Sequence, residues 1–291
     1  MCFDCERDRL TRRSFLAPAA ASAAGLAIPV PARGEQAPDR QVLNDPKLIL
    51  EEIAYSNGSA SISGFLARPR DSRRHPALLL LHGDPGLPDW VRVCAARLAR
   101  AEYVVLVMDV GSDPAVQNRP PEYYGSSAFD ERVTLNARAG FGYLESQVFT
   151  RAGGLGMVGF CFGGRMAFLV PLEAAEVKAA VVFYGPVRDR VSRNAADPKP
   201  HVIELAARFK VPIQGHYGTR DRVAQEQDAK ELEQLLRAQR TPIEMFYYQG
   251  AGHGFYGNTW KEQTPEVGYN GPAARLAHTR MIRFLGRHLK K

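Results

Sequence analysis

The chain has 291 residues, of which 45% are hydrophobic, and its formal net charge is +7. This length and composition allow one sizeable folded domain or two small ones. The basic residues are scattered apart from a mild cluster near the C-terminus, and no base-reading motif accompanies them. We therefore expect no nucleic-acid partner.

The first 32 residues are predicted to be a twin-arginine-type signal peptide. Arg12 and Arg13 stand in the sequence TRRSFL, an alanine-rich and weakly apolar run follows, and small residues at Val30 and Ala32 suit cleavage. The prolines in this run disfavour a buried helix, although an uncleaved anchor is the alternative. The segment predicts export by the twin-arginine machinery to the periplasm or the medium. After cleavage we expect no stable membrane association.

Residues 33–45 are predicted to be a linker and residues 46–291 a single domain. The domain pattern begins with two strands, 50–56 and 61–68, which the turn 57–60 joins as an antiparallel pair. Further strands are expected at 76–82, 102–110, 154–160, 177–185, 211–218 and 243–249. Helices are expected at 89–101, 130–147, 163–175, 224–240 and 271–289. This alternation predicts an α/β fold, with a mostly parallel central sheet of about eight strands and helices on both faces.

The four cysteines differ in their surroundings. Cys2 and Cys5 form a C-x-x-C within the predicted leader, which is too few ligands for a metal site. Cys94 falls in a helical pattern and is expected to be a buried core residue, with a disulfide as the alternative. Cys161 differs from the other three because glycines flank it. We expect neither a metal nor an organic cofactor.

Cys161 lies between glycines where a buried strand is followed by a helix, in the sequence GFCFGG. A nucleophile on a tight strand-to-helix turn needs small residues two positions before and after it, here Gly159 and Gly163. The helix N-terminus also favours a thiolate. The pattern predicts that Cys161 is a nucleophile. A buried thiol beside packing glycines is the alternative.

Two residues are candidates to activate this thiol. Asp221 follows the strand 211–218, and His253 follows the strand 243–249, so both lie at carboxyl ends of strands, where α/β sheets gather their sites. The order nucleophile, acid, histidine is typical of this fold class. We expect Asp221 to orient His253, which exchanges a proton with Cys161. Taken singly, Asp221 could be a helix cap and His253 an ordinary loop residue.

Two backbone N–H groups are predicted to bind the oxyanion. One belongs to Phe162, directly after the nucleophile. The other is assigned to Asp84 in the sequence HGDPG, since Pro85 has no N–H. Gly83 and Gly86 would allow the backbone to approach closely.

The sequences GFCFGG, GTRD and GAGHGF, together with the ending GYNGPAARLAHTR, resemble the dienelactone hydrolase family of the α/β-hydrolase superfamily. The resemblance covers about residues 45–290. It implies the α/β-hydrolase fold and hydrolysis of enol-lactones or similar activated esters (carboxymethylenebutenolidase-like chemistry) without metal or organic cofactor. Carried onto this chain, it makes Cys161 the nucleophile, His253 the base and Asp221 the orienting acid.

The chain departs from the family pattern at two positions. Family members commonly carry a glutamate after the residue matching His82, where this chain has Gly83. This departure predicts a different activation of the thiol, or partial replacement by Asp84. It also keeps open a non-catalytic protein that binds a small molecule. The second departure is the lack of an arginine shortly after His253, which argues against dienelactone itself as substrate.

Aromatic residues are the candidates for the substrate pocket. Tyr123 and Tyr124 lie in a long loop, and Phe255, Tyr256 and Trp260 follow His253. They would form an apolar pocket for a small ester or lactone. Ordinary packing of aromatic residues is the alternative.

Overall fold

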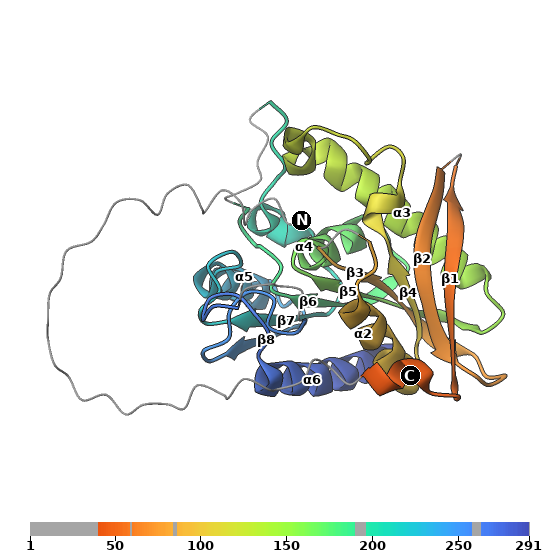
Figure 1. Cartoon of the computed structure of the whole chain (residues 1–291). Helices are drawn as coiled ribbons and strands as arrows, with labels where there is room; N and C mark the ends of the chain where they lie inside the picture. The colour runs from red at the N-terminus through yellow and green to blue at the C-terminus, as the bar shows by residue number, and fades with distance from the viewer. Residues whose placement is uncertain (1–39, 59, 84–85, 190–195, 258–262, 291) are drawn as a thin grey trace, which may run out of the picture.

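The computed structural model describes residues 40–58, 60–83, 86–189, 196–257 and 263–290 (Figure 1). The predicted signal peptide, residues 1–32, lies outside the described residues. The predicted linker is described only from Arg40, where the short 3-10 helix η1 (Arg40–Asn44) packs against helix α2 through the buried Val42.

Eight strands form one sheet in the order β1-β2-β4-β3-β5-β6-β7-β8. Strand β2 pairs antiparallel with β1 and β4, and all other neighbours pair parallel. The fold class predicted from the sequence is confirmed. The strands are β1 (Leu48–Asn57), β2 (Ala60–Pro69), β3 (His75–Leu81), β4 (Val104–Met108), β5 (Thr150–Phe160), β6 (Val177–Phe183), β7 (Ile213–Gly218) and β8 (Ile243–Tyr248).

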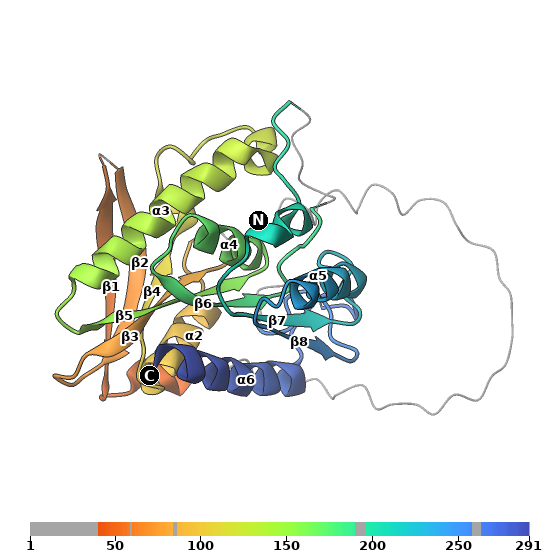
Figure 2. The ribbon, with the colours of Figure 1, turned by 180° about the vertical axis from the view of Figure 1, so that it is seen from behind.

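Helices cover both faces of this sheet (Figures 1 and 2). Helices α2 (Asp89–Arg100) and α6 (Gly271–Leu289) lie on one face, and α3 (Ser127–Ser146) and α4 (Phe162–Leu169) lie on the other. Helix α5 (Glu226–Ala238) packs against β7 and β8. Every residue of β3 and β4 is buried, because these central strands face helices on both sides.

The helix ends follow local rules that refine the predicted boundaries. Helix α3 begins at Ser127, before the expected Asp130, because the Ser126 hydroxyl accepts a hydrogen bond from the Phe129 N–H at 3.2 Å. Helix α4 ends at Leu169 and passes into the 3-10 helix η4 (Val170–Leu172). Pro171 therefore ends the regular helix before residue 175, where the sequence pattern placed its end.

Three further 3-10 helices lie in the connections between strands and helices. Between β4 and α3 stand η2 (Val110–Ser112) and η3 (Pro121–Gly125), and between β6 and β7 stands η5 (Val202–Arg208). The 3-10 helix η5 was not predicted from the sequence. Among the described residues, no helix has the length and apolar character needed to span a bilayer.

Candidate active site

Cys161 lies at the sharp turn between β5 and α4. Its backbone has φ 55° and ψ −119°, a combination that residues other than glycine rarely adopt. The turn is held at both sides, since the Cys161 N–H donates to the Phe183 carbonyl at 3.0 Å and the Arg165 N–H donates to the Cys161 carbonyl at 3.0 Å. The surrounding fold therefore imposes the strained conformation of this cysteine.

The glycines around Cys161 are required by close backbone approaches. A Cβ atom at Gly159 would lie 1.9 Å from the Gly163 carbonyl oxygen. A Cβ atom at Gly163 would lie 2.2 Å from the Leu81 carbonyl oxygen. No side chain fits at either position, which is the steric demand expected from the sequence.

Three side chains meet at the carboxyl edge of the sheet. His253 Nε2 lies 3.0 Å from Cys161 Sγ, and His253 Nδ1 lies 2.8 Å from Asp221 Oδ2. His253 is 2% exposed and Asp221 6%, whereas Cys161 is half-buried. The three residues follow β8, β7 and β5, so the sheet brings together groups that are far apart in the sequence.

Backbone donors hold the Asp221 carboxylate in place. Its Oδ1 accepts hydrogen bonds from the Val223 and Ala224 N–H groups, each at 2.8 Å, and its Oδ2 faces His253. Helix α5 begins only at Glu226, with Gln225 as its N-cap, so Asp221 is not the cap of that helix. An ionised carboxylate in this position favours the imidazole tautomer with its proton on Nδ1, leaving Nε2 to face the thiol.

The loop that carries His253 is fixed by neighbouring segments. The His253 N–H donates to the Glu266 carbonyl at 2.6 Å, and the Gly268 N–H donates to the His253 carbonyl at 2.9 Å. The Tyr184 ring meets the imidazole edge to face, with 5.1 Å between centroids. Sequence reasoning missed Tyr184, although its place directly after β6 puts it at the same edge of the sheet.

Comparison with known proteins places the chain in a family. The model of the dienelactone hydrolase family matches residues 62–289. The chain belongs to the dienelactone hydrolase family. Membership makes it an ester or lactone hydrolase, and it confirms the resemblance noted in the sequence.

Relatives and solved structures agree with this placement. A Bradyrhizobium protein named "Probable 2-oxo-3-(5-oxofuran-2-ylidene)propanoate lactonase" is 30% identical over 206 residues, which are 69% of this chain and 81% of the relative. A Methylorubrum extorquens protein named "Putative carboxymethylenebutenolidase" is 26% identical over 255 residues, 85% of this chain and 84% of the relative. The crystal structure titled "Putative Dienelactone Hydrolase" from Klebsiella pneumoniae has the same fold, with TM-score 0.69, 21% identity, and coverage of 83% of this chain and 99% of that one.

In this family member, Gly83 lies directly beside the sulfur. A Cβ atom at Gly83 would lie 3.3 Å from Cys161 Sγ and 3.4 Å from the Phe162 backbone nitrogen. The glycine therefore leaves space beside both the thiol and the N–H predicted to bind the oxyanion. The second predicted donor, Asp84, lies outside the described residues.

The predicted pocket residues Tyr123 and Tyr124 lie in an aromatic cluster that reaches the nucleophile. Their rings pack on Phe129, with centroids 5.6 Å and 5.3 Å away. Phe129 in turn stacks on Phe162 at 5.1 Å. The cluster thus connects η3 to the residue that directly follows Cys161.

Tyr256 does not take the place predicted for it in the substrate pocket. It is 4% exposed, and its hydroxyl lies 2.7 Å from His278 Nδ1 and 3.4 Å from Cys94 Sγ. Its side chain is therefore held between α2 and α6, and Phe255 is also fully buried. The packing alternative is correct for both residues, while Trp260 lies outside the described residues.

Cys94 is the buried core residue that the helical pattern predicted. It is 1% exposed, and burial raises the pKa of its thiol to about 11. In the described part of the chain neither Cys94 nor Cys161 forms a disulfide. The same part holds no group of three or more His, Cys, Asp or Glu side chains placed to bind a metal ion.

Proposed function

We propose that this hydrolase cleaves small ester or lactone bonds through Cys161 as nucleophile, His253 as general base and acid, and Asp221 as the orienting acid. The observation that supports this most strongly is the continuous contact from Asp221 through His253 to Cys161, at 2.8 Å and 3.0 Å. Contacts of this length allow a proton to pass between sulfur and Nε2.

The reaction proceeds in two stages. The Cys161 thiolate attacks the carbonyl carbon, a C–S bond forms, and the C–O bond to the leaving alcohol breaks as His253 gives that oxygen its proton. Water then attacks the thioester while His253 takes one of its protons, and the acid is released with the sulfur regenerated. In a lactone, the released alcohol and acid remain parts of one molecule.

The oxyanion of each stage is assigned to the backbone N–H groups of Phe162 and Asp84. Phe162 is the first residue of α4, so its N–H is one of the groups at the helix N-terminus that lack a partner within the helix. The space that Gly83 leaves beside Cys161 supports this assignment.

The substrate is proposed to be a small ester or lactone with an apolar or aromatic part. The cluster of Tyr123, Tyr124 and Phe129 against Phe162 supports this, because an aromatic wall offers apolar contact area. Residues 254–257 after His253 include no arginine, which disfavours a substrate that relies on a carboxylate contact there.

A panel of lactones and aryl esters, including nitrophenyl acetate, tests the proposal. Cys161→Ala is expected to lower kcat/KM by about 10⁴-fold or more, because the nucleophile is removed. Cys161→Ser should be weak, since the site activates a thiol rather than a hydroxyl. Cys94→Ala serves as the matched control and should keep kcat/KM within about twofold.

Full activity of Cys161→Ala with a native circular-dichroism spectrum would exclude this mechanism. Equal losses in the two alanine variants would trace the effect to the fold instead of the nucleophile.

We also propose that residues 1–32 direct twin-arginine export and that the mature protein, residues 33–291, acts in the periplasm or the medium. The paired Arg12 and Arg13 support this. Mass spectrometry of the exported protein should give a chain that begins at Arg33. A cytoplasmic product that keeps residue 1 would contradict the proposal.

A further inference from the structure

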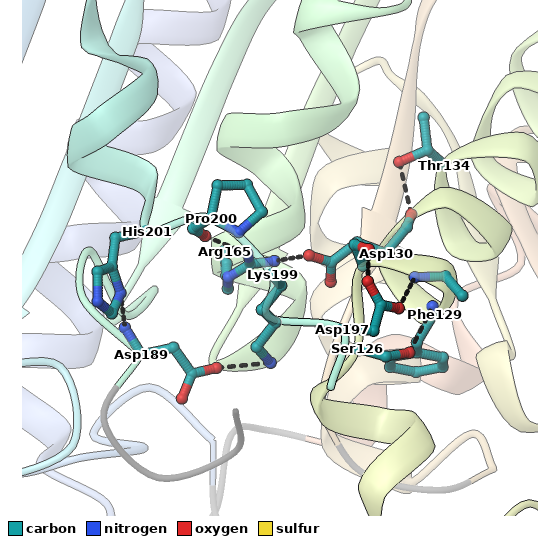
Figure 3. A network of polar contacts seen from close by, with 12 residues as sticks. Ser126, Phe129, Asp130, Thr134, Arg165, Asp189, Asp197, Lys199, Pro200 and His201 are labelled. Atoms are coloured by element: carbon teal, nitrogen blue, oxygen red, sulfur yellow. Dashed lines mark hydrogen bonds and ion pairs between the residues drawn. The ribbon is translucent and has the colours of Figure 1, made fainter. Parts of the chain in front are cut away.

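A buried arginine lies one helical turn after the nucleophile. Arg165 of α4 is 1% exposed, and its backbone N–H donates to the Cys161 carbonyl. Its guanidinium makes two separate contacts: Nη1 donates to Asp130 Oδ2 at 2.6 Å, and Nη2 donates to the Pro200 carbonyl at 2.8 Å (Figure 3). Arg165 therefore joins α4 to α3 and to the segment before η5.

A second contact joins the same two helices. Asp130 lies in the first turn of α3, and its neighbour Phe129 stacks on Phe162, with ring planes 24° apart. Phe162 carries the N–H assigned to the oxyanion. An ionic contact and an aromatic contact thus fix the first turn of α4 against the first turn of α3.

The segment 196–200 is itself tied to α3 and to the loop that follows β6. Asp197 accepts hydrogen bonds from the Ser127 hydroxyl and from the Ala128 N–H, the latter at 3.2 Å. The buried Lys199 pairs with Asp189 at 2.6 Å (Figure 3). Contacts other than the one with Arg165 therefore fix the position of the Pro200 carbonyl.

Stability alone does not explain the buried charges. Removing two charges from water costs several kcal/mol per ion, and apolar residues of similar volume often replace a buried ion pair without loss of stability. A guanidinium has a planar fork that fixes direction as well as distance. Fixed direction matters for α4, because a small displacement of an oxyanion donor costs much of the rate.

We propose that Arg165 is a positioning residue that sets the Phe162 N–H relative to Cys161, through its contacts with Asp130 and the Pro200 carbonyl. It does not touch the reacting atoms. The inference rests on the proposed function, because it assumes that Cys161 is acylated and that Phe162 binds the oxyanion.

Two reactions of Cys161 separate positioning from simple support of the fold. Acylation by nitrophenyl acetate forms a C–S bond, releases nitrophenolate and develops charge on the carbonyl oxygen. Alkylation by iodoacetamide also forms a C–S bond, but it releases iodide and develops no such oxyanion. The test uses the mature chain, residues 33–291, whose cysteines are Cys94 and Cys161. Cys94 does not compete, because it is buried and burial raises its pKa to about 11.

Arg165→Met is expected to lower the maximal acylation rate about ten- to a hundredfold. The substrate concentration at half-saturation and the alkylation rate constant should change by less than about twofold. Arg188→Met is the matched control, because the ion pairs of Arg188 among the described residues are with Asp228 and Glu231 of α5 and not with α4. This control should keep the acylation rate within about twofold.

Unchanged acylation in Arg165→Met, or equal losses of acylation and alkylation, would overturn the proposal. If Arg165→Met does not fold, acylation and alkylation are compared in the double variant Asp130→Asn, Arg165→Gln. This variant removes both charges of the buried Arg165–Asp130 pair, so neither charge is left without its partner. Failure of the proposed function would give another result: Cys161→Ala would then still release nitrophenolate from nitrophenyl acetate.

Discussion

Within the described residues, two hydrogen-bonded clusters each include a cysteine and a histidine, and their surroundings are very different. The edge cluster lies at the carboxyl ends of the strands and consists of Cys161, His253 and Asp221. The interior cluster lies between α2 and α6 and consists of Cys94, Tyr256 and His278. The comparison shows how the surroundings of the proposed nucleophile differ from those of a buried thiol.

In the interior cluster, burial keeps both titratable ends neutral. It raises the pKa of Cys94 to about 11 and lowers the pKa of His278 to about 3. The Tyr256 hydroxyl lies between them, and neither of its two contacts is with a carboxylate. The edge cluster differs in having a carboxylate behind the imidazole and a half-buried sulfur. Cys94 and His278 meet only through the Tyr256 hydroxyl, whereas Cys161 contacts its imidazole directly. The carboxylate and the access to the sulfur are two further differences between the clusters.

The largest expected effect is that of low pH on stability. Buried histidines that are neutral in the folded protein favour unfolding when the pH falls, because they bind protons in the unfolded chain. Burial lowers the pKa of His82 to about 4 and that of His216 and His278 to about 3. Below about pH 6.5 the unfolded chain binds protons that the folded chain does not, so stability is lost as pH falls towards about 4. Between pH 7.5 and 5.5 the three residues should together lower the free energy of unfolding by about 4 kcal/mol. Urea unfolding at the two pH values measures this.

His278→Gln isolates the contribution of the interior cluster. It should remove about one third of this pH dependence, because one of three titrating groups is lost. A pH dependence that is unchanged in this variant would mean that His278 is not held neutral by burial.

The acid of the edge cluster is tested by Asp221→Asn. The amide can still accept from the Val223 and Ala224 N–H groups, so the fold should survive. It no longer supports a charged imidazole or fixes its tautomer, and kcat/KM for nitrophenyl acetate should fall about a hundredfold or more. Asp228→Asn is the control, since Asp228 is a buried, ion-paired aspartate outside the cluster. Similar losses in both variants would contradict the special role of Asp221.

The two clusters also show what the sequence can and cannot reveal. Cys161, Asp221 and His253 could be proposed from the sequence because each lies at or shortly after the end of a predicted strand, and parallel strands end at one edge of a sheet. Tyr256 was misassigned, because its distance from His253 in the sequence says nothing of which way a loop side chain points. Here a hydrogen bond to His278, 22 residues further on, sets that direction.

The Arg165 contacts were equally hidden. Their partners Asp130 and Pro200 each lie 35 residues from Arg165, and the segment before η5 has no hydrophobic period to place it. A buried ion pair between elements depends on the tertiary arrangement, whereas the positions of the strands follow from local patterns. The strands were therefore predicted well and these polar contacts were not predicted.

The smallest expected effect concerns access to the sulfur, the second feature that separates the edge cluster from the interior one. In Gly83→Ala the new Cβ would lie 3.2 Å from Cys161 Cβ and 3.3 Å from Cys161 Sγ, and both distances are tighter than ordinary contact. The neighbours must move by a few tenths of an ångström, and we expect kcat/KM for nitrophenyl acetate to fall about tenfold. Gly142→Ala in α3 is the control, because its Cβ would meet nothing within 4 Å and alanine favours a helix. Unchanged kcat/KM in Gly83→Ala would show that the space beside the sulfur is not needed, leaving the carboxylate as the feature that distinguishes the two clusters.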